Sequence, residues 1–441
     1  MPHVIVAGGG LAGMAAAAAL AGEGWRVTLF EARGFLGGRA TSFPASPSEE
    51  ASEAIDNCPH ILLRCCVNLQ DFYERLGVAD RIRFHGDYHF IEPGGRISVL
   101  RAGHLPAPLH LAWSFSRLHF LSAGSKLAIA RGVAAIRRER GRRRDLDDIT
   151  MLEWLREKNQ PPEAIAHFWR PVLVSAVNAE LEVMAAGHGL QVFHLSFLTR
   201  SDSYEMGVSS VPLGELYTSK AWDGLPGLTV RLRSPVNRIQ FDGQRVSGVE
   251  SGGVRDAADY YICALPFERL RDAAPGLDLD LSAFRHSPIT AIHLWFDRPI
   301  TSLAQAALVG RTIQWLFSKG GGRYVQLVVS ASDALVGMSS NQVIELALRE
   351  LAEFFPLVRE ALLERARVIK ELRATLLPAP GLEALRPASR TAFDNLFLAG
   401  DWTRSGWPST MEGAVRSGYL AAEAVTQAAQ QPRRFLLPDL A

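Results

Sequence analysis

The chain has 441 residues, 48% of them hydrophobic and 21% charged, with a formal net charge of +1. This length predicts two or three domains with an ample core, and the composition is typical of a soluble globular protein. Because the chain is nearly neutral, its charge offers no general attraction for nucleic acid, and we expect none to bind.

Neither the cysteines nor the apolar runs indicate a secreted or membrane-spanning protein. Cys58, Cys65, Cys66 and Cys263 lack a zinc spacing and are too few for a disulfide framework, so we expect thiols in a reducing compartment. No uninterrupted apolar run reaches the ~20 residues of a membrane span, and the N-terminus lacks the basic segment of a signal peptide. The sequence therefore predicts a cytoplasmic protein.

The first thirty-one residues predict a strand, a glycine turn, a helix and a second strand. Gly8, Gly10 and Gly13 fill the G-x-G-x-x-G pattern directly after the apolar residues Val4–Ala7. In that pattern the first glycine allows a tight turn, the second lets backbone approach a pyrophosphate, and the third lets the helix pack on the strand. The pyrophosphate then lies at the helix N-terminus, where free N–H groups favour negative charge.

Glu31 ends the second predicted strand, where the acid that holds the ribose hydroxyls is expected. A carboxylate there would repel a 2′-phosphate, so FAD or NAD fits and NADP fits poorly. The alternative is a strand-turn-helix unit without a ligand. The combination of glycines, flanking elements and acid favours a dinucleotide.

A second glycine pair, Gly37 and Gly38, follows and precedes Arg39. The forked guanidinium can bind phosphate, or it can fix the loop. Residues 43–54 are rich in Pro, Ser and Glu and predict a mobile loop. Asp56 and His60 come next as candidates for proton chemistry. The alternative is that Asp56 caps the following helix or turn and that His60 is a packing residue.

Residues 103–136 are apolar and aromatic, and an arginine-rich run at 137–144 follows them. An apolar helical segment that ends in a basic cluster suits the surface of a membrane with anionic lipids. The alternative is a core helix followed by a solvated charged loop. The first interpretation predicts a cytoplasmic protein that is peripheral on the inner membrane.

The rest of the chain alternates between helical and strand-like patterns. Residues 150–220 predict mainly helix, with a capping box at Thr150 and Glu153. A β-meander is expected from Leu228 to Pro266, more strands from about 289 to 330, and a helix from about 341 to 365. Near the end, a buried strand leads to Gly400 and Asp401, and a helix begins near Met411.

Taken together, the glycine fingerprint with Glu31, the Gly37-Gly38-Arg39 stretch and the Leu398–Asp401 stretch resemble the FAD-dependent amine oxidase and phytoene desaturase superfamily. The resemblance implies that Glu31 holds the adenosine ribose and Arg39 the phosphates. It also implies that the backbone of Val236 reads adenine, that Asp401 holds a ribityl or phosphate oxygen, and that the Met411 amide meets the flavin ring. The full implied FAD set is Gly8, Gly10, Leu11, Ala12, Gly13, Glu31, Ala32, Gly38, Arg39, Ala40, Val236, Gly400, Asp401 and Met411.

The implied fold is α/β, with a discontinuous Rossmann-like FAD-binding domain and a mixed α+β substrate domain. We expect FAD-binding parts at 1–78, 223–275 and 389–430. We expect substrate-domain parts at 79–222, which includes the candidate membrane-facing segment 103–136, and at 276–388. Residues 431–441 are then a tail.

A narrower resemblance points to the squalene-associated branch, the hydroxysqualene dehydroxylases of bacterial squalene and hopanoid biosynthesis. It is carried by Asp56-Asn57 with His60 and by residues 68–77, 211–217 and 406–418. It implies reductive removal of the hydroxyl of hydroxysqualene, with His60 or Asp56 handling the proton. Trp402 and Trp407 are expected near that site, where aromatic faces can stabilise an allylic cation.

The sequence leaves alternative functions open. The alternatives are a carotenoid or polyene desaturase or an amine oxidase, and, in another class, a flavin-free escort of prenylated proteins. No lysine is recognisable as the one that some amine oxidases place beside the flavin, which weakens that alternative. Since no second dinucleotide fingerprint stands out, we expect an external electron donor.

Overall fold

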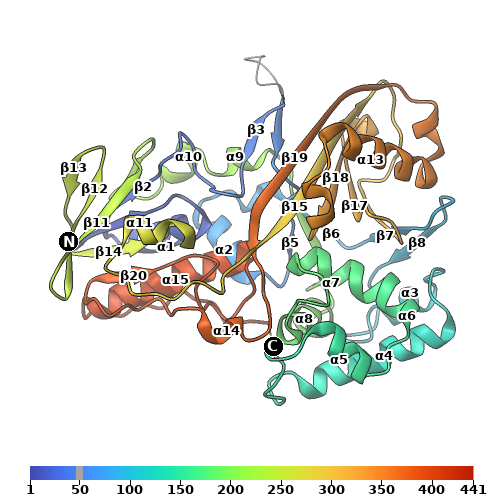
Figure 1. Cartoon of the computed structure of the whole chain (residues 1–441), viewed down its shortest axis with the longest axis horizontal. Helices are drawn as coiled ribbons and strands as arrows, with labels where there is room; N and C mark the ends of the chain where they lie inside the picture. The colour runs from blue at the N-terminus through green and yellow to red at the C-terminus, as the bar shows by residue number, and fades with distance from the viewer. Residues whose placement is uncertain (46–52, 441) are drawn as a thin grey trace.

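The computed structural model describes residues 1–45 and 53–440 and has the α/β architecture that the sequence predicts (Figure 1). A parallel five-stranded sheet runs in the order β10-β2-β1-β14-β20. Its strands are β1 (His3–Ala7), β2 (Arg26–Phe30), β10 (Leu228–Arg231), β14 (Tyr260–Cys263) and β20 (Leu396–Leu398). Since β14 pairs with both β1 and β20, the two ends of the chain meet in this sheet, as expected.

Helix α1 (Leu11–Gly22) lies against this sheet and against α15 (Met411–Ala428) (Figure 1). It is rich in alanine, and every residue except Gly22 is buried, so it is apolar on all sides. A Cβ on Gly418 would lie 2.2 Å from the carbonyl oxygen of Ala12. The glycine therefore lets α15 pack directly onto the helix that follows the glycine turn.

The predicted single β-meander from Leu228 to Pro266 is wrong in its connectivity. Strands β10 and β14 join the parallel sheet, whereas β11 (Val236–Asp242), β12 (Arg245–Ser251) and β13 (Val254–Asp256) form a separate antiparallel sheet. The side-chain period is two in both sheets, so periodicity cannot tell which partner a strand takes.

A second, mixed sheet has seven strands in the order β19-β15-β18-β17-β16-β7-β8. Its strands are β7 (Tyr88–Ile91), β8 (Ile97–Leu100), β15 (His286–Phe296), β16 (Gln305–Leu308), β17 (Trp315–Lys319), β18 (Tyr324–Ser330) and β19 (Leu363–Leu376). Helix α13 (Ser340–Phe354) covers the apolar face. Because side chains alternate along a strand, His293, Trp295, Tyr324 and Gln326 lie together on the opposite face.

The helix expected from 341 to 365 ends earlier, at Phe354. Pro356 follows, and a proline has no N–H with which to continue the helix. Residues from Leu363 onward instead form β19, which pairs with β15 along the length of that strand. The prediction was therefore wrong for the last turns.

A helical lobe lies at the lower right of Figure 1. Its main helices are α3 (Ala112–Ser116), α4 (Ala123–Glu139), α5 (Met151–Glu157), α7 (Arg170–Val177) and α8 (Ala186–Phe193). The predicted capping box of Thr150 and Glu153 is confirmed. Residues 103–111 form a loop and not the first part of a helix. None of the helices in the described part of the chain combines the length and apolarity of a membrane span.

The expected mobile loop at 43–54 overlaps an antiparallel pair, β3 (Ser42–Pro44) and β4 (Ala54–Asp56); residues 46–52 lie outside the described residues. A small sheet joins β5 (Leu62–Leu63), β9 (Met206–Ser209) and β6 (Ile82–His85). The remaining helices are α2 (Val67–Arg75), α6 (Pro162–Ala164), α9 (Leu213–Leu216), α10 (Ser219–Trp222), α11 (Leu270–Ala273), α12 (Asp333–Val336) and α14 (Leu382–Leu385). Two π-helical turns occupy Ile165–Trp169 and His194–Leu198.

Candidate active site

The glycine turn between β1 and α1 leaves open space where a pyrophosphate would lie. Gly8 has a φ of 116°, and a Cβ there would lie 2.6 Å from the carbonyl oxygen of Ala264. A Cβ on Gly13 would lie 1.9 Å from the carbonyl oxygen of Gly8. A Cβ on Gly10, by contrast, would meet no atom of the described residues within 4 Å. The three glycines thus match the separate roles of tight turn, helix packing and close approach.

The N-terminus of α1 is arranged to receive an anion. Gly10 is the N-cap, no side chain among the described residues caps this end, and the first turn has no acidic residue. The N–H of Met14 donates to the carbonyl oxygen of Gly10, so the N–H groups of Leu11, Ala12 and Gly13 precede that bond and stay available. Such an end suits a diphosphate.

Glu31 ties the end of β2 to the glycine turn. One carboxylate oxygen accepts from the N–H of Gly9 at 2.8 Å and the other from the N–H of Arg33 at 2.7 Å. The backbone carbonyl oxygen of Glu31 accepts from the N–H of Ser234 at 2.8 Å. This bond places the residues that lead into the buried Val236 beside Glu31 and Ala32. The residues predicted to hold ribose and adenine are therefore neighbours.

The second glycine pair packs against the first turn. The N–H of Gly37 donates to the carbonyl oxygen of Gly9 at 2.9 Å, and that of Ala40 to Gly37 at 3.0 Å. A Cβ on Gly38 would lie only 3.0 Å from the Cα of Gly10. This contact fixes the direction in which Arg39 leaves the loop.

The Arg39 guanidinium pairs with Asp401, with 2.5 Å between Nη2 and Oδ1. It also donates to the carbonyl oxygen of Ala374 at 3.0 Å. Burial alone would raise the pKa of Asp401, but the positive charge of Arg39 and a hydrogen bond from Ser409 hold that pKa below its ordinary value. Asp401 is thus a buried carboxylate that joins the first and the last of the predicted FAD-binding segments.

Gly400 and Met411 complete that junction. Gly400 has a φ of 147°, and its N–H donates to the Ser417 hydroxyl at 2.9 Å. Met411 is the first residue of α15, after the N-cap Thr410, whose hydroxyl accepts from the N–H of Gly413 at 3.1 Å. The Met411 N–H therefore lies at a helix start, where amides point outward.

Asp56 is buried and receives three donors. The hydroxyl of Ser42 at 2.8 Å and the N–H of Leu213 at 2.9 Å reach one oxygen, and Lys319 Nζ lies 3.3 Å from the other. The expectation that Asp56 caps the following helix is wrong. The backbone N–H that donates to it belongs to Leu213, the first residue of α9, which lies 157 residues along the chain. Asp56 therefore accepts from donors that lie on three different elements.

His60 lies beside the Gly38–Arg39 stretch. Its Nε2 is 2.9 Å from Asn57 Oδ1 and 3.2 Å from the Cys58 thiol, and the Asn57 amide nitrogen donates to the Arg39 carbonyl oxygen at 2.7 Å. Burial lowers the pKa of His60 to about 4, a shift that Asp56 opposes and Arg39 adds to. At neutral pH the ring is therefore uncharged and holds no readily given proton.

Lys319 and Gln326 were not singled out from the sequence, yet they complete this group. With Asp56 and His60 they line a small cavity whose remaining wall is mostly apolar and includes Val208, Leu213 and Phe317. Lys319 ends β17 and Gln326 lies in β18, far from Asp56 in the chain. Their only sequence signal was the rarity of lysine, which has five positions against an arginine-rich background.

Residues 11–426 match the model of the flavin containing amine oxidoreductases. The chain belongs to this family. FAD is its cofactor, and the open space at Gly10, the uncapped end of α1 and the Arg39–Asp401 pair fit such a group. The chain is therefore a flavin-dependent oxidoreductase, and the alternative of a flavin-free escort protein is disfavoured.

Curated relatives and solved structures agree with the family. The chain is 26% identical to the 15-cis-phytoene desaturase of an Oncidium hybrid cultivar, over 96% of this chain and 78% of that protein. It is 25% identical to the zeta-carotene desaturase of Synechocystis, over 96% and 97%. Putrescine oxidase bound to putrescine shares the fold with a TM-score of 0.70 at 16% identity, over 97% and 98% of the two chains.

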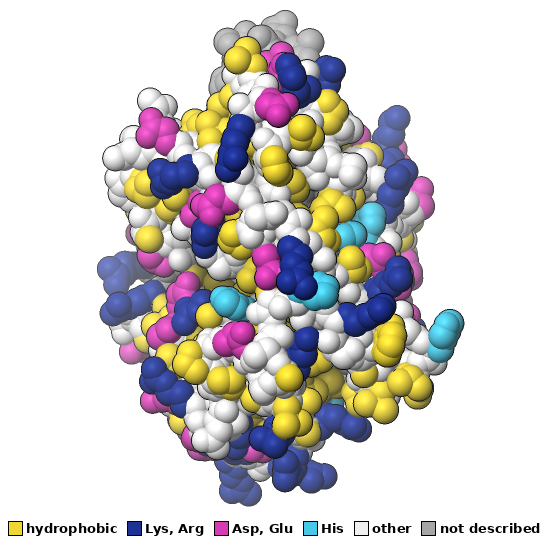
Figure 2. Space-filling model, turned by 90° about the vertical axis from the view of Figure 1, so that its right-hand side faces the viewer, with side chains coloured by type: hydrophobic (Ala, Val, Ile, Leu, Met, Phe, Trp, Pro, Cys, Tyr) yellow, Lys and Arg dark blue, Asp and Glu magenta, His cyan; other side chains and the backbone are white. Residues whose placement is uncertain are grey.

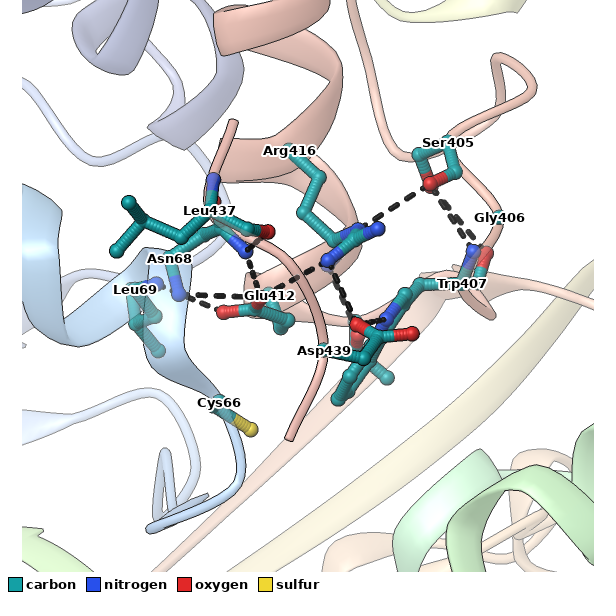
Figure 3. Close-up of polar contacts among 12 residues, drawn as sticks. Cys66, Asn68, Leu69, Ser405, Gly406, Trp407, Glu412, Arg416, Leu437 and Asp439 are labelled. Atoms are coloured by element: carbon teal, nitrogen blue, oxygen red, sulfur yellow. Dashed lines mark hydrogen bonds and ion pairs between the residues drawn. The ribbon is translucent and has the colours of Figure 1, made fainter. Parts of the chain in front are cut away.

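A second buried polar group surrounds Glu412, the second residue of α15 (Figure 3). Glu412 is 1% exposed and accepts from the N–H of Leu69 at 2.7 Å and from the Asn68 amide at 2.9 Å. Burial raises the pKa of Glu412 to about 7, although these hydrogen bonds oppose the shift. The carboxyl joins α2 to the start of α15.

The C-terminal segment closes this group from the other side (Figure 3). Asp439 accepts from Arg416 at 2.9 Å and from the indole N–H of Trp407 at 3.0 Å, and the N–H of Leu437 donates to Asn68 at 2.8 Å. The Arg416 guanidinium lies 5.6 Å from the Trp407 ring centroid. Trp407 is therefore held on two sides. The predicted tail therefore packs against α2, α15 and Trp407, and no local sequence pattern indicates these contacts.

Proposed function

We propose that this flavoenzyme reductively removes the hydroxyl of hydroxysqualene to give squalene. The observation that carries the proposal is the cavity at Asp56 and His60, which sets polar groups against an apolar wall. The hydroxyl end of an isoprenoid alcohol needs both, since the carbon that bears the oxygen is apolar and the oxygen must be bound and protonated as it leaves. The relatives named for carotenoids support an isoprenoid, and carotenes carry no hydroxyl to match the polar groups.

When bound, reduced FAD supplies a hydride for the carbon that loses oxygen. The residues of this chain would then bind the alcohol, exclude water and deliver one proton, so that the products are squalene, water and oxidised FAD. We propose that Asp56 and His60 handle that proton. Since Asp56 is held as an acceptor and His60 is uncharged, both would act by positioning a third group or a water. Trp402 and Trp407, which were expected at this site, do not line the cavity: Trp402 packs in an apolar cluster with Val236 and Leu398, and Trp407 donates to Asp439.

The decisive test is anaerobic product analysis. Purified enzyme with chemically reduced FAD is mixed with hydroxysqualene, and squalene is measured against flavin reoxidation. We expect one squalene for each flavin reoxidised. Reoxidation without squalene, or no reaction at all, would overturn the proposal. Oxidised enzyme with phytoene and a quinone tests the desaturase alternative, and aerobic peroxide release from polyamines tests the amine oxidase alternative.

We also propose an external electron donor for the flavin. The described chain has one nucleotide-binding turn, at Gly8–Gly13, and that turn serves FAD. NADPH added to the pure protein under nitrogen should leave the oxidised flavin spectrum unchanged over minutes. Rapid bleaching by NADPH alone would contradict this part of the proposal.

We further propose that the helical lobe contacts an anionic bilayer. On α4, Leu127 is 55% exposed, and Ala123, Ala130 and Ala134 lie on the same exposed stripe, which ends at Arg137 and Arg138. Nearby Leu105, Leu109 and Trp113 are 53%, 56% and 69% exposed. Figure 2 shows hydrophobic and basic side chains together at the lower end of this face. Apolar side chains edged by arginines complement anionic lipid.

A further inference from the structure

Lys319 and Gln326 lie on the polar face of the seven-stranded sheet, opposite Asp56. Strands β17 and β18 pair with Phe317 across from Gln326 and Lys319 across from Tyr324. Lys319 Nζ lies 3.3 Å from Asp56 Oδ2, and the Gln326 amide nitrogen donates to the Asp56 carbonyl oxygen at 3.2 Å. Asp56 thus holds both side chains in fixed orientations.

The amide of Gln326 can be oriented only one way. A backbone carbonyl oxygen accepts hydrogen bonds and never donates, so the nitrogen of the amide must face Asp56. Oε1 then faces away from that contact. Gln326 is 1% exposed, and its Oε1 has no hydrogen-bond partner among the described residues. A buried acceptor without a donor is unfavourable, so this oxygen is available to a donor on a bound group.

The cavity beside these two side chains suits a single oxygen atom. It measures about 20 Å³, which is room for one water or one hydroxyl group. Lys319 offers donors only, and Gln326 Oε1 offers an acceptor. A hydroxyl group is complementary to this pair, because its oxygen accepts one hydrogen bond and its hydrogen donates another.

Among the polar groups of this cavity, Lys319 is the charged donor, and the Ser209 hydroxyl already donates to the carbonyl oxygen of Val211 at 2.6 Å. Asp56 is an acceptor for Ser42, Leu213 and Lys319 itself. His60 is neutral at physiological pH. Lys319 is about one-third exposed, so it can regain a proton from solvent after giving one.

We propose that Lys319 and Gln326 form the pocket that binds the oxygen of an alcohol substrate, and that Lys319 protonates this oxygen as it leaves. The proposal rests on the proposed reductive function. The carbon–oxygen bond breaks with its electron pair on oxygen, the proton from Nζ completes a water molecule, and the hydride from reduced FAD forms the new carbon–hydrogen bond. Asp56 is the positioning residue for both side chains.

Binding to the oxidised holoenzyme tests the pocket without turnover. Hydroxysqualene and squalene are titrated into the FAD-loaded protein, and the change in flavin absorbance gives both Kd values. We expect the wild type to prefer the alcohol by about tenfold or more, as a charged hydrogen bond allows. Lys319→Met and Gln326→Leu should lose this preference while their affinity for squalene is unchanged.

Lys370→Met is the matched control, because among the described residues Lys370 donates to the Val336 and Met338 carbonyl oxygens of the same domain and not to this cavity. It should keep the alcohol preference. In single turnover with reduced FAD, Lys319→Met should lose at least about a hundredfold in rate, and Lys319→Arg should keep the alcohol preference. FAD content and circular dichroism show that each variant is folded.

The outcomes separate the two proposals. A wild type that prefers the alcohol but makes no squalene leaves the pocket standing and removes the proposed function. A wild type that makes squalene while Lys319→Met does so equally fast, and still prefers the alcohol, removes the pocket. No preference in the wild type also overturns the pocket.

Discussion

Arg39 and Asp401 form an ion pair of 2.5 Å although 362 residues separate them. Asp401 is 7% exposed, and its second oxygen accepts from Ser409. The pair therefore joins the loop after the ribose acid to the turn before α15. It makes the geometry of the FAD-binding segments depend on both ends of the chain.

We expect Asp401→Asn to weaken both the fold and FAD binding. The change leaves the Arg39 guanidinium without its counter-charge, which costs about 1–3 kcal/mol for a partly buried charged hydrogen bond. Urea unfolding of the apo protein measures the first effect, and titration with FAD measures the second. Arg311→Gln, which breaks the exposed Arg311–Glu353 pair, is the control and should cost under about 0.5 kcal/mol. Equal losses in the two variants would contradict the prediction.

Gly10→Ala and Gly13→Ala should separate cofactor binding from folding. A Cβ on Gly10 would meet no atom within 4 Å in the part of the chain that the structure describes, so the fold should keep its stability within about 0.5 kcal/mol. That methyl group stands where the pyrophosphate approaches, and we expect FAD affinity to fall at least about tenfold. Fluorescence titration of the apo protein measures this affinity.

Gly13→Ala forces a Cβ to 1.9 Å from the backbone of Gly8. Two backbone segments must separate, so the apo protein itself should lose about 1–3 kcal/mol. Thermal unfolding without FAD measures this loss. If Gly13→Ala were as stable as Gly10→Ala without cofactor, the assignment of Gly13 to helix packing would be wrong.

Glu412 should give the protein a pH-dependent stability. Burial raises its pKa from 4.5 to about 7, so the folded state holds a proton that the unfolded state has released. Stability from this group is present below about pH 4.5, falls as pH rises to about 7, and is then constant, a loss of up to about 3 kcal/mol. Glu412→Gln should lack this fall. Urea midpoints at pH 5 and pH 8 for both proteins measure it, and parallel curves would exclude it.

The exposed apolar side chains of the helical lobe should mediate vesicle binding. Wild-type protein should sediment with vesicles that contain phosphatidylglycerol, and less so at high salt. Trp113→Ser with Leu109→Ser should reduce the bound fraction several-fold, because each removes about 1.5–3 kcal/mol of apolar burial. Leu362→Ser is the control, since Leu362 is 70% exposed at the start of β19, outside that lobe. Equal binding by all three proteins would remove the proposed bilayer contact.

Sequence reasoning succeeded where one short stretch carries the geometry. Gly8, Gly10 and Gly13 have distinct steric roles that the spacing alone predicts, and Glu31 follows at the end of the next strand. The buried strand and the glycine before Asp401 were also predicted correctly, and the role of Asp401 toward FAD stays a prediction. These features are local, so the chain needs only its nearest neighbours to form them.

The polar cavity could not be read in the same way. Lys319 and Gln326 reach Asp56 through the pairing of β17 with β18 and the docking of that sheet on the β3–β4 pair, 263 and 270 residues along the chain. Nothing beside either residue indicates that contact. The helix after Asn341 was extended too far for a similar reason, because its apolar spacing continues into residues that β15 recruits as a strand.

The order of the elements along the chain has a consequence for folding during synthesis. Helix α1 is apolar on every side and is covered by α15, and β20 borders β14. Both covering elements follow residue 395 and are synthesised after the segments that they cover. The side of α1 that faces α15 therefore stays exposed while those segments are made. We expect chaperones to bind this surface on the nascent chain, and FAD to be taken up only after α15 has been made.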